Sequence, residues 1–277
     1  MDENMNEELM QENGSNYIDS HCHLNSPELR GGIPAVLERA RAAGVVRMAV
    51  IGSTLADSAE ALEICRRHKP YGLFPVVGIH PHEVKDLPLG ELPRELLDMA
   101  ALSEVKAWGE IGLDYYYDLS PRAAQIEKLA QQLEAARALN RPVVFHVRDA
   151  YDDFWPLMTA ERAPEKAELH CFTGSLDDAR RALDRGWKIG VTGMVTFAKA
   201  EDIRAVVREL PAQAILCETD SPWMSPKPFR GTVNEPSRVP LVYRKVAEVK
   251  NMALDELAAQ VWRNNMEFFG LEEDARV

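Results

Sequence analysis

The chain has 277 residues, and its 46% hydrophobic content is enough for a large buried core in one domain. A formal net charge of −12 argues against a protein that coats nucleic acid through a broad basic surface, although an enzyme could still hold one or two phosphates at a local cationic site. No run approaches the roughly 18 apolar residues of a membrane span, and four widely spaced cysteines without a Cys-x-x-Cys pair favour reduced thiols in a cytoplasmic protein.

The first 16 residues are polar and acidic, with five carboxylates and no Lys or Arg. They lack the basic region followed by an apolar stretch that is typical of a secretory signal. We therefore expect a flexible tail over residues 1–16 and one domain over residues 17–277, since no linker or change in composition divides the rest of the chain.

From Tyr17 onward, short apolar runs alternate with longer amphipathic stretches. The runs predict eight strands, at residues 17–24, 45–53, 73–81, 105–115, 142–149, 167–174, 187–194 and 214–222. Helices are predicted at residues 33–43, 55–68, 92–102, 121–139, 152–160, 176–184 and 202–210, with two more at 239–250 and 254–269 after a proline-rich segment. Strands separated by helices run parallel, and eight such units close into a barrel. The expected fold is an α/β, single-domain (β/α)₈ TIM barrel with extra C-terminal helices.

The first predicted strand ends in His21-Cys22-His23. Because successive side chains of a strand point to opposite faces, His21 and His23 share a face and could bind one metal ion. Such short pairs also recur by chance, so the pair alone is weak evidence. Whether it forms a site depends on what the other strands contribute.

In (β/α)₈ barrels the catalytic groups lie at the C-terminal ends of strands, and candidate residues occur at several of these ends. Besides the first pair, they are His80 and His82, Glu110 and Asp114, His146 and Arg148, His170, and Glu218 and Asp220. A lone histidine is more often structural, but chance hardly explains ligand-type residues at so many strand ends. Even spacing within each strand again indicates a common face. The set exceeds what one ion needs and suits two divalent ions in a hydrolytic centre.

Other polar residues have competing interpretations. Cys22, Cys171 and Cys217 each neighbour a proposed ligand, so alternation predicts that they point away from the lumen and pack as small buried residues. Asp114 and Glu218 could orient a ligand histidine instead of binding metal. The tyrosines at positions 115–117 could stack a nucleobase or simply pack their loop.

Five segments together resemble the TatD-type metal-dependent deoxyribonucleases, a family of the amidohydrolase-like barrels. They are residues 19–24 (DSHCHL), 78–82 (GIHPH), 109–116 (GEIGLDYY), 170–174 (HCFTG) and 218–223 (ETDSPW). The similarity continues in order from about residue 18 to 269 and includes 229–231 (FRG) and 234–236 (NEP). The acidic extension before Tyr17 departs from the family, which usually begins close to the His-x-His strand.

The resemblance implies roles for individual residues. His21, His23, Glu110 and Asp220 would bind one ion, and Glu110, His146 and His170 the other, with Glu110 bridging. Asp220 would orient or deprotonate the attacking water. His80, His82, Arg148 and Tyr115 would contact the substrate, and Asp114 and Glu218 would support the ligands. Imidazole-rich ligation favours Zn or Mn, and Mg, Ni or Fe could also serve.

The resemblance further implies hydrolysis of phosphodiester bonds in DNA by a metal-bound hydroxide, acting from the 3′ end of single strands. The same centre could instead attack a carbonyl, as in an ester or amide hydrolase such as a D-aminoacyl-tRNA deacylase. A metal-stabilised binding protein is a third alternative. We expect weak, salt-sensitive DNA binding, no membrane association and no obligatory protein partner.

Overall fold

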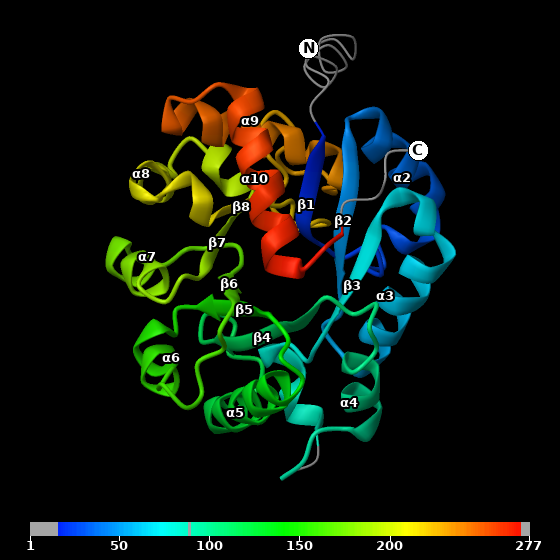
Figure 1. Cartoon of the computed structure of the whole chain (residues 1–277), viewed down its shortest axis with the longest axis vertical. Helices are drawn as coiled ribbons and strands as arrows, with labels where there is room; N and C mark the ends of the chain where they lie inside the picture. Colours follow the sequence, from blue (N-terminus) through cyan, green and yellow to red (C-terminus); the bar gives the residue numbers. More distant parts are fainter. Residues whose placement is uncertain (1–15, 88–89, 273–277) are drawn as a thin grey trace.

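The computed structural model describes residues 16–87 and 90–272. The tail expected at residues 1–16 lies, apart from Asn16, outside this part of the chain. The described residues form one eight-stranded parallel sheet in the order β1-β2-β3-β4-β5-β6-β7-β8, wrapped by helices (Figure 1). A parallel bridge between Cys22 and Ser221 brings the end of the first strand to the segment after the last. This confirms the predicted (β/α)₈ barrel.

All eight predicted strands are present. They are β1 (Tyr17–Cys22), β2 (Val45–Ile51), β3 (Leu73–Val77), β4 (Ala107–Asp114), β5 (Val143–Arg148), β6 (Ala167–Leu169), β7 (Lys188–Val191) and β8 (Ile215–Cys217). All eight end earlier than predicted, and β6 and β8 have only three residues each. Beyond these ends the backbone leaves extended geometry, with left-handed φ angles at Cys171 and Asp220. The residues with metal-binding chemistry therefore often stand just past a strand.

The helices also follow the predicted pattern. They are α2 (Ile33–Ala42), α3 (Leu55–Arg67), α4 (Arg94–Ala100), α5 (Arg122–Ala138), α6 (Tyr151–Leu157), α7 (Leu176–Leu183), α8 (Glu201–Glu209), α9 (Val239–Lys250) and α10 (Leu254–Phe269). Capping side chains set several starts: Thr54 accepts a hydrogen bond from the Asp57 amide, and Ser175 forms a reciprocal capping box with Asp178. Helix α6 is shorter than predicted and ends one residue after Pro156.

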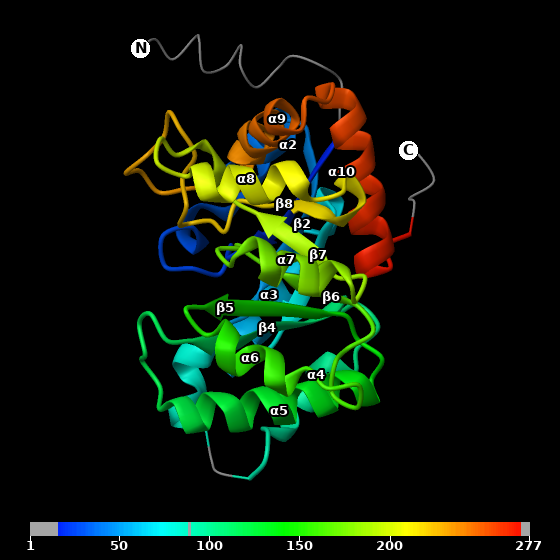
Figure 2. The same cartoon turned by 90° about the vertical axis from the view of Figure 1, so that its left-hand side faces the viewer.

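Apolar side chains fill two regions of the barrel. One core cluster lies between the strands and the surrounding helices, and it includes Cys22, Cys65 and Cys217. The other combines strand residues such as Ile51 and Phe74 with Phe268 and Phe269 at the end of α10. Figure 2 shows α10 standing across the end of the barrel where the strands begin. We call this second cluster the barrel floor. Among the described helices, none is both long and apolar enough to cross a bilayer.

One cysteine departs from the prediction. Cys22 and Cys217 pack in the buried core as expected, whereas Cys171 is only partly buried and its Sγ lies 3.7 Å from the Thr192 hydroxyl. The reason is local: β6 already ends at Leu169, and Cys171 has a φ of 44°. Strand alternation therefore no longer determines where its side chain points.

Candidate metal centre

The first group of candidate ligands converges on the His21–His23 pair. The two Nε2 atoms are 3.2 Å apart, and both rings are buried. Asp220 Oδ1 lies 3.8 Å from the His21 nitrogen and 3.6 Å from the His23 nitrogen. Two imidazole nitrogens bound to one tetrahedral zinc ion would be about 3.3 Å apart, given Zn–N bonds of about 2.05 Å. This donor set therefore fits a divalent ion.

A second pair of nitrogens lies on the other side of Glu110. His146 Nδ1 and His170 Nε2 are 3.3 Å apart, and Glu110 Oε2 lies 3.6 Å from the former and 3.1 Å from the latter. His80 Nε2 is 4.0 Å from the same oxygen. Glu110 and His146 lie within β4 and β5, whereas His170 and His80 lie in the segments that follow β6 and β3.

Glu110 is common to both groups. Its Oε1 lies 3.5 Å from His23 Nε2 and its Oε2 lies 3.8 Å from His21 Nε2, in addition to the contacts with the second pair. Burial raises the pKa of this carboxyl, but His80, His146 and His170 outweigh burial and hold the pKa well below its usual range. The carboxylate is thus ionised, as a bridging ligand must be.

Asp114 supports the second pair from behind. Its Oδ2 lies 2.9 Å from His146 Nε2 and 2.9 Å from His82 Nε2, while its Oδ1 accepts hydrogen bonds from the backbone amides of Tyr116 and Tyr117. Burial opposes the charged form, but the two histidines and the amide hydrogen bonds keep the Asp114 pKa well below its ordinary value. Because Nε2 of His146 faces Asp114, its Nδ1 is left for the centre. Carboxylates commonly orient metal-binding histidines in this way.

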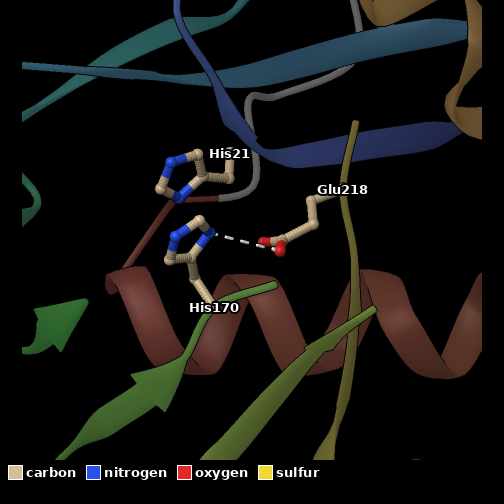
Figure 3. A group of neighbouring side chains, drawn as sticks. All are labelled: His21, His170 and Glu218. Carbon is tan, nitrogen blue, oxygen red and sulfur yellow. Dashed lines mark ion pairs between the residues drawn. The ribbon is translucent and has the colours of Figure 1, made fainter. Parts of the chain in front are cut away.

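Glu218 stands behind His170 in a similar position (Figure 3). Its Oε1 lies 3.5 Å from His170 Nδ1 and accepts a hydrogen bond from the Cys171 amide, and its Oε2 accepts one from the Ser20 hydroxyl. The His21 ring stacks on the His170 ring at 3.9 Å. His21, His170 and Glu218 also have ligand atoms close enough to hold an ion themselves. The hydrogen bonds that Glu218 already accepts favour the orienting role.

One buried acid beside the centre was not expected from the sequence. Glu168 lies on β6, and both of its carboxylate oxygens are buried without a hydrogen-bond partner. Burial and the neighbouring Glu218 raise its pKa well above the usual value, which favours the protonated form. Gly190 makes space for both acids, since a Cβ there would lie 2.7 Å from Glu168 Oε1 and 2.8 Å from each Glu218 oxygen. The sequence feature that could have identified Glu168 is its place as an acidic residue in a short buried strand, two positions before His170.

Asp19 links the first strand to the end of the last. Its Oδ1 accepts a hydrogen bond from the Thr219 amide at 2.8 Å, and its Oδ2 accepts one from the Thr219 hydroxyl at 2.6 Å. Burial raises the pKa of Asp19 to about 8 despite these hydrogen bonds. Because Thr219 is next to Asp220, this contact helps to place the Asp220 carboxylate, which follows β8, beside His21 and His23.

The residues predicted to contact the substrate have different surroundings in the structure. His80 and His82 lie beside Glu110 and Asp114, as described above, and the Arg148 guanidinium lies 3.9 Å from the centre of the Tyr116 ring. Tyr115 turns elsewhere: its hydroxyl donates to Asp153 at 2.8 Å, and the Arg122 guanidinium covers its ring at 4.0 Å. The neighbouring Tyr116 and Tyr117 are the exposed members of the tyrosine run.

The chain is similar to known proteins over most of its length. The family described as "TatD related DNase" matches residues 18–270. The chain belongs to this family. It is 34% identical to the "Uncharacterized metal-dependent hydrolase YabD" of Bacillus subtilis over 91% of this chain and 98% of the relative. It is 33% identical to the "3'-5' ssDNA/RNA exonuclease TatD" of Erwinia amylovora, over 92% of this chain and 100% of the relative.

Solved structures of the TatD-related family share the fold. The crystal structure of the TatD homologue YjjV from Escherichia coli superimposes with a TM-score of 0.84, at 30% sequence identity, and covers 94% of this chain and 100% of that one. Family membership and the cluster of histidines and carboxylates make the protein a metal-dependent hydrolase of the TatD-related family. The fold and the family predicted from the sequence are both confirmed.

Proposed function

We propose that the protein is a nuclease that hydrolyses phosphodiester bonds from the 3′ end of single-stranded DNA, with two divalent ions bound. The observation that carries the proposal is the position of Glu110, whose ionised carboxylate lies between two pairs of histidine nitrogens. A carboxylate shared in this way suits two adjacent ions. The name of the Erwinia relative supports a nucleic-acid substrate.

When bound, the two ions would supply a water nucleophile at neutral pH and positive charge toward the phosphate. Their ligands would be His21, His23 and Asp220 on one side and His146 and His170 on the other, with Glu110 between them. Zn or Mn suits these imidazole-rich groups best.

The remaining groups act on the substrate. Asp220 lies within 3.8 Å of both histidines of the first pair, where its carboxylate can orient the attacking water or accept its proton. Arg148 offers a planar guanidinium for two phosphate oxygens. His80 and His82 can donate hydrogen bonds to the remaining oxygens. Asp114 and Glu218 hold His146 and His170 in place, and Tyr115 supports the loop that carries its two neighbours.

The test is an assay of metal-reconstituted protein on single-stranded DNA labelled at the 3′ end. We expect release of labelled mononucleotide, and no release by the Glu110→Gln and Asp220→Asn variants. A D-aminoacyl-tRNA is assayed in parallel, because the same groups could hydrolyse an ester. Turnover of aminoacyl-tRNA much faster than that of DNA would overturn the proposed substrate, and fewer than one ion per folded chain would overturn the metal centre.

We also propose a cytoplasmic location. The four cysteines are free thiols, as expected in a reducing compartment.

A further inference from the structure

Exposed aromatic side chains gather on two loops beside the metal centre. Within the described residues, the exposed large hydrophobic side chains are Tyr116, Tyr117, Leu119, Leu139, Trp223 and Val233. All but Leu139 belong to the loop that follows β4 or to the segment that follows β8. Exposed apolar side chains concentrated around a site commonly mark a binding surface.

Trp223 stands beside the first group of ligands. Its ring is 51% exposed and meets the His23 ring edge-on, with 5.1 Å between the ring centres. The Trp223 amide donates a hydrogen bond to the Asp220 carbonyl, so the indole is held on the same turn as a proposed ligand. One side of the ring is thereby fixed against the site while half of its surface remains open.

The tyrosine pair stands beside the second group. The Tyr117 ring meets the His82 ring edge-on at 5.5 Å, and His82 lies against Asp114. Tyr116 and Tyr117 meet at 89°, and their exposed fractions are 57% and 53%. The Arg148 guanidinium lies over both rings, 3.9 Å from the centre of Tyr116 and 4.9 Å from that of Tyr117. A cation and two partly open aromatic rings thus occupy one side of the centre.

We propose that Trp223 and the Tyr116–Tyr117 pair are two base-stacking platforms, which hold the nucleobases on either side of the phosphate to be cleaved. The inference rests on the proposed nuclease function and adds how that site selects its substrate. Aromatic rings stack on any unpaired base, whereas bases inside a duplex already stack on one another and cannot reach a side chain. The platforms would therefore select single strands with little sequence preference, while Arg148 contacts the phosphate between them.

The test measures binding separately from hydrolysis. The Glu110→Gln variant, which should not cleave DNA, is titrated into two fluorescein-labelled oligothymidylates of equal length, and fluorescence anisotropy is recorded. One oligonucleotide is complete, and the other lacks the bases of its two 3′-terminal nucleotides. We expect the complete strand to bind about 5- to 150-fold more tightly for each stacked base.

Further substitutions in the same background locate the effect. Trp223→Ala, or Tyr116→Ala with Tyr117→Ala, should reduce the preference for the complete strand and leave the affinity for the strand lacking bases unchanged. Trp223→Phe should retain most of the preference because it keeps an aromatic ring. Leu139→Ala is the matched control, since Leu139 is 37% exposed but follows α5, away from these loops.

The outcomes separate the two proposals. Equal binding of both oligonucleotides by the Glu110→Gln protein, combined with DNA hydrolysis by the unmodified enzyme, would overturn the platforms alone. Absence of both binding and hydrolysis would instead overturn the nuclease function. Self-association in analytical ultracentrifugation that Trp223→Ala abolishes would also overturn the platforms, because it would assign this ring to an interface between copies of the chain.

Discussion

The two ends of the barrel are built from opposite kinds of side chain. At the end where the strands begin, the barrel floor is apolar and closed by Phe268 and Phe269 of α10. At the other end, buried histidines and carboxylates collect, and several of their atoms have no hydrogen-bond partner, including His21 Nδ1 and both oxygens of Glu168. Each such atom costs about 1–3 kcal/mol in the folded protein.

The same scaffold thus keeps the residues that stabilise the fold apart from those that would bind a ligand. The floor stabilises the fold through apolar burial that needs no ligand. The opposite end, which we call the mouth, holds pairs of histidine nitrogens 3.2 and 3.3 Å apart, distances that suit a bound divalent ion. Ions that bind only the folded state should therefore raise the melting temperature. Substitutions at both ends of the barrel test this division.

Glu110→Gln removes the charge shared by both ligand groups at the mouth. We expect kcat/KM on 3′-labelled DNA to fall by about 10³-fold, because the ions that would stabilise the transition-state charge lose the ligand they share. The rise in melting temperature on adding Mn²⁺ should shrink as well. Both quantities are measured on the same preparation, by kinetics and by scanning calorimetry. An unchanged kcat/KM would contradict the central role of Glu110.

Phe269→Ala opens a cavity in the floor, where Phe269 is buried against Phe74. The free energy of unfolding should fall by about 3–5 kcal/mol. Urea denaturation measures this loss. The metal content of the folded fraction and its kcat/KM should stay near those of the unmodified enzyme. A comparable loss of metal affinity would mean that the two ends are not independent.

Asp114→Asn keeps the shape of the residue that orients His146 but removes its charge. Metal affinity should fall about 10- to 100-fold, as expected when a carboxylate behind a ligand histidine is altered. Isothermal titration of the metal-free protein measures the change. Asp118→Asn, in the same loop but on the surface, is the control and should have no effect. Equal effects of the two substitutions would point to general loop damage.

Gly190→Ala places a methyl group against the buried Glu168 and Glu218 carboxyls. Overpacking of this kind should destabilise the protein by about 1–3 kcal/mol, measured by urea denaturation. Combining it with Glu168→Ala should recover part of the loss, because the shortened side chain removes one of the two carboxyl groups that the methyl group meets. Gly31→Ala is the comparison, since no atom lies within 4 Å of an added Cβ there. If the double variant is as unstable as the single one, contact with Glu168 is not the cause.

Much of this organisation could be read from local sequence patterns. The alternation of apolar runs and amphipathic stretches predicted all eight strands and the helices between them, because burial of a strand or of a helix face repeats at a characteristic spacing. Strand parity also indicated which candidates would share a face. The structure brings Glu110, His146 and His170 within about 4 Å of one another, as that reasoning implied.

The exceptions occur where the strands have ended. Cys171 escapes the alternation because its backbone is left-handed, and Tyr115 faces Asp153 whereas its two neighbours face the mouth. In these loops no periodic pattern in the sequence indicates which way a side chain points. The sequence identified the run of tyrosines at positions 115–117, but it did not indicate which of their rings would be exposed.

Residue types and their short-range spacing were enough to predict the barrel, the family and the set of residues with metal-binding chemistry. The contacts between distant residues emerged only from the folded chain: Trp223 against His23, Asp19 against Thr219, and Glu168 against Glu218 across the space left by Gly190. These contacts join residues from different strands and from the loops beyond them. Periodicity reports that a side chain is buried, but the partner it meets depends on how the whole barrel closes.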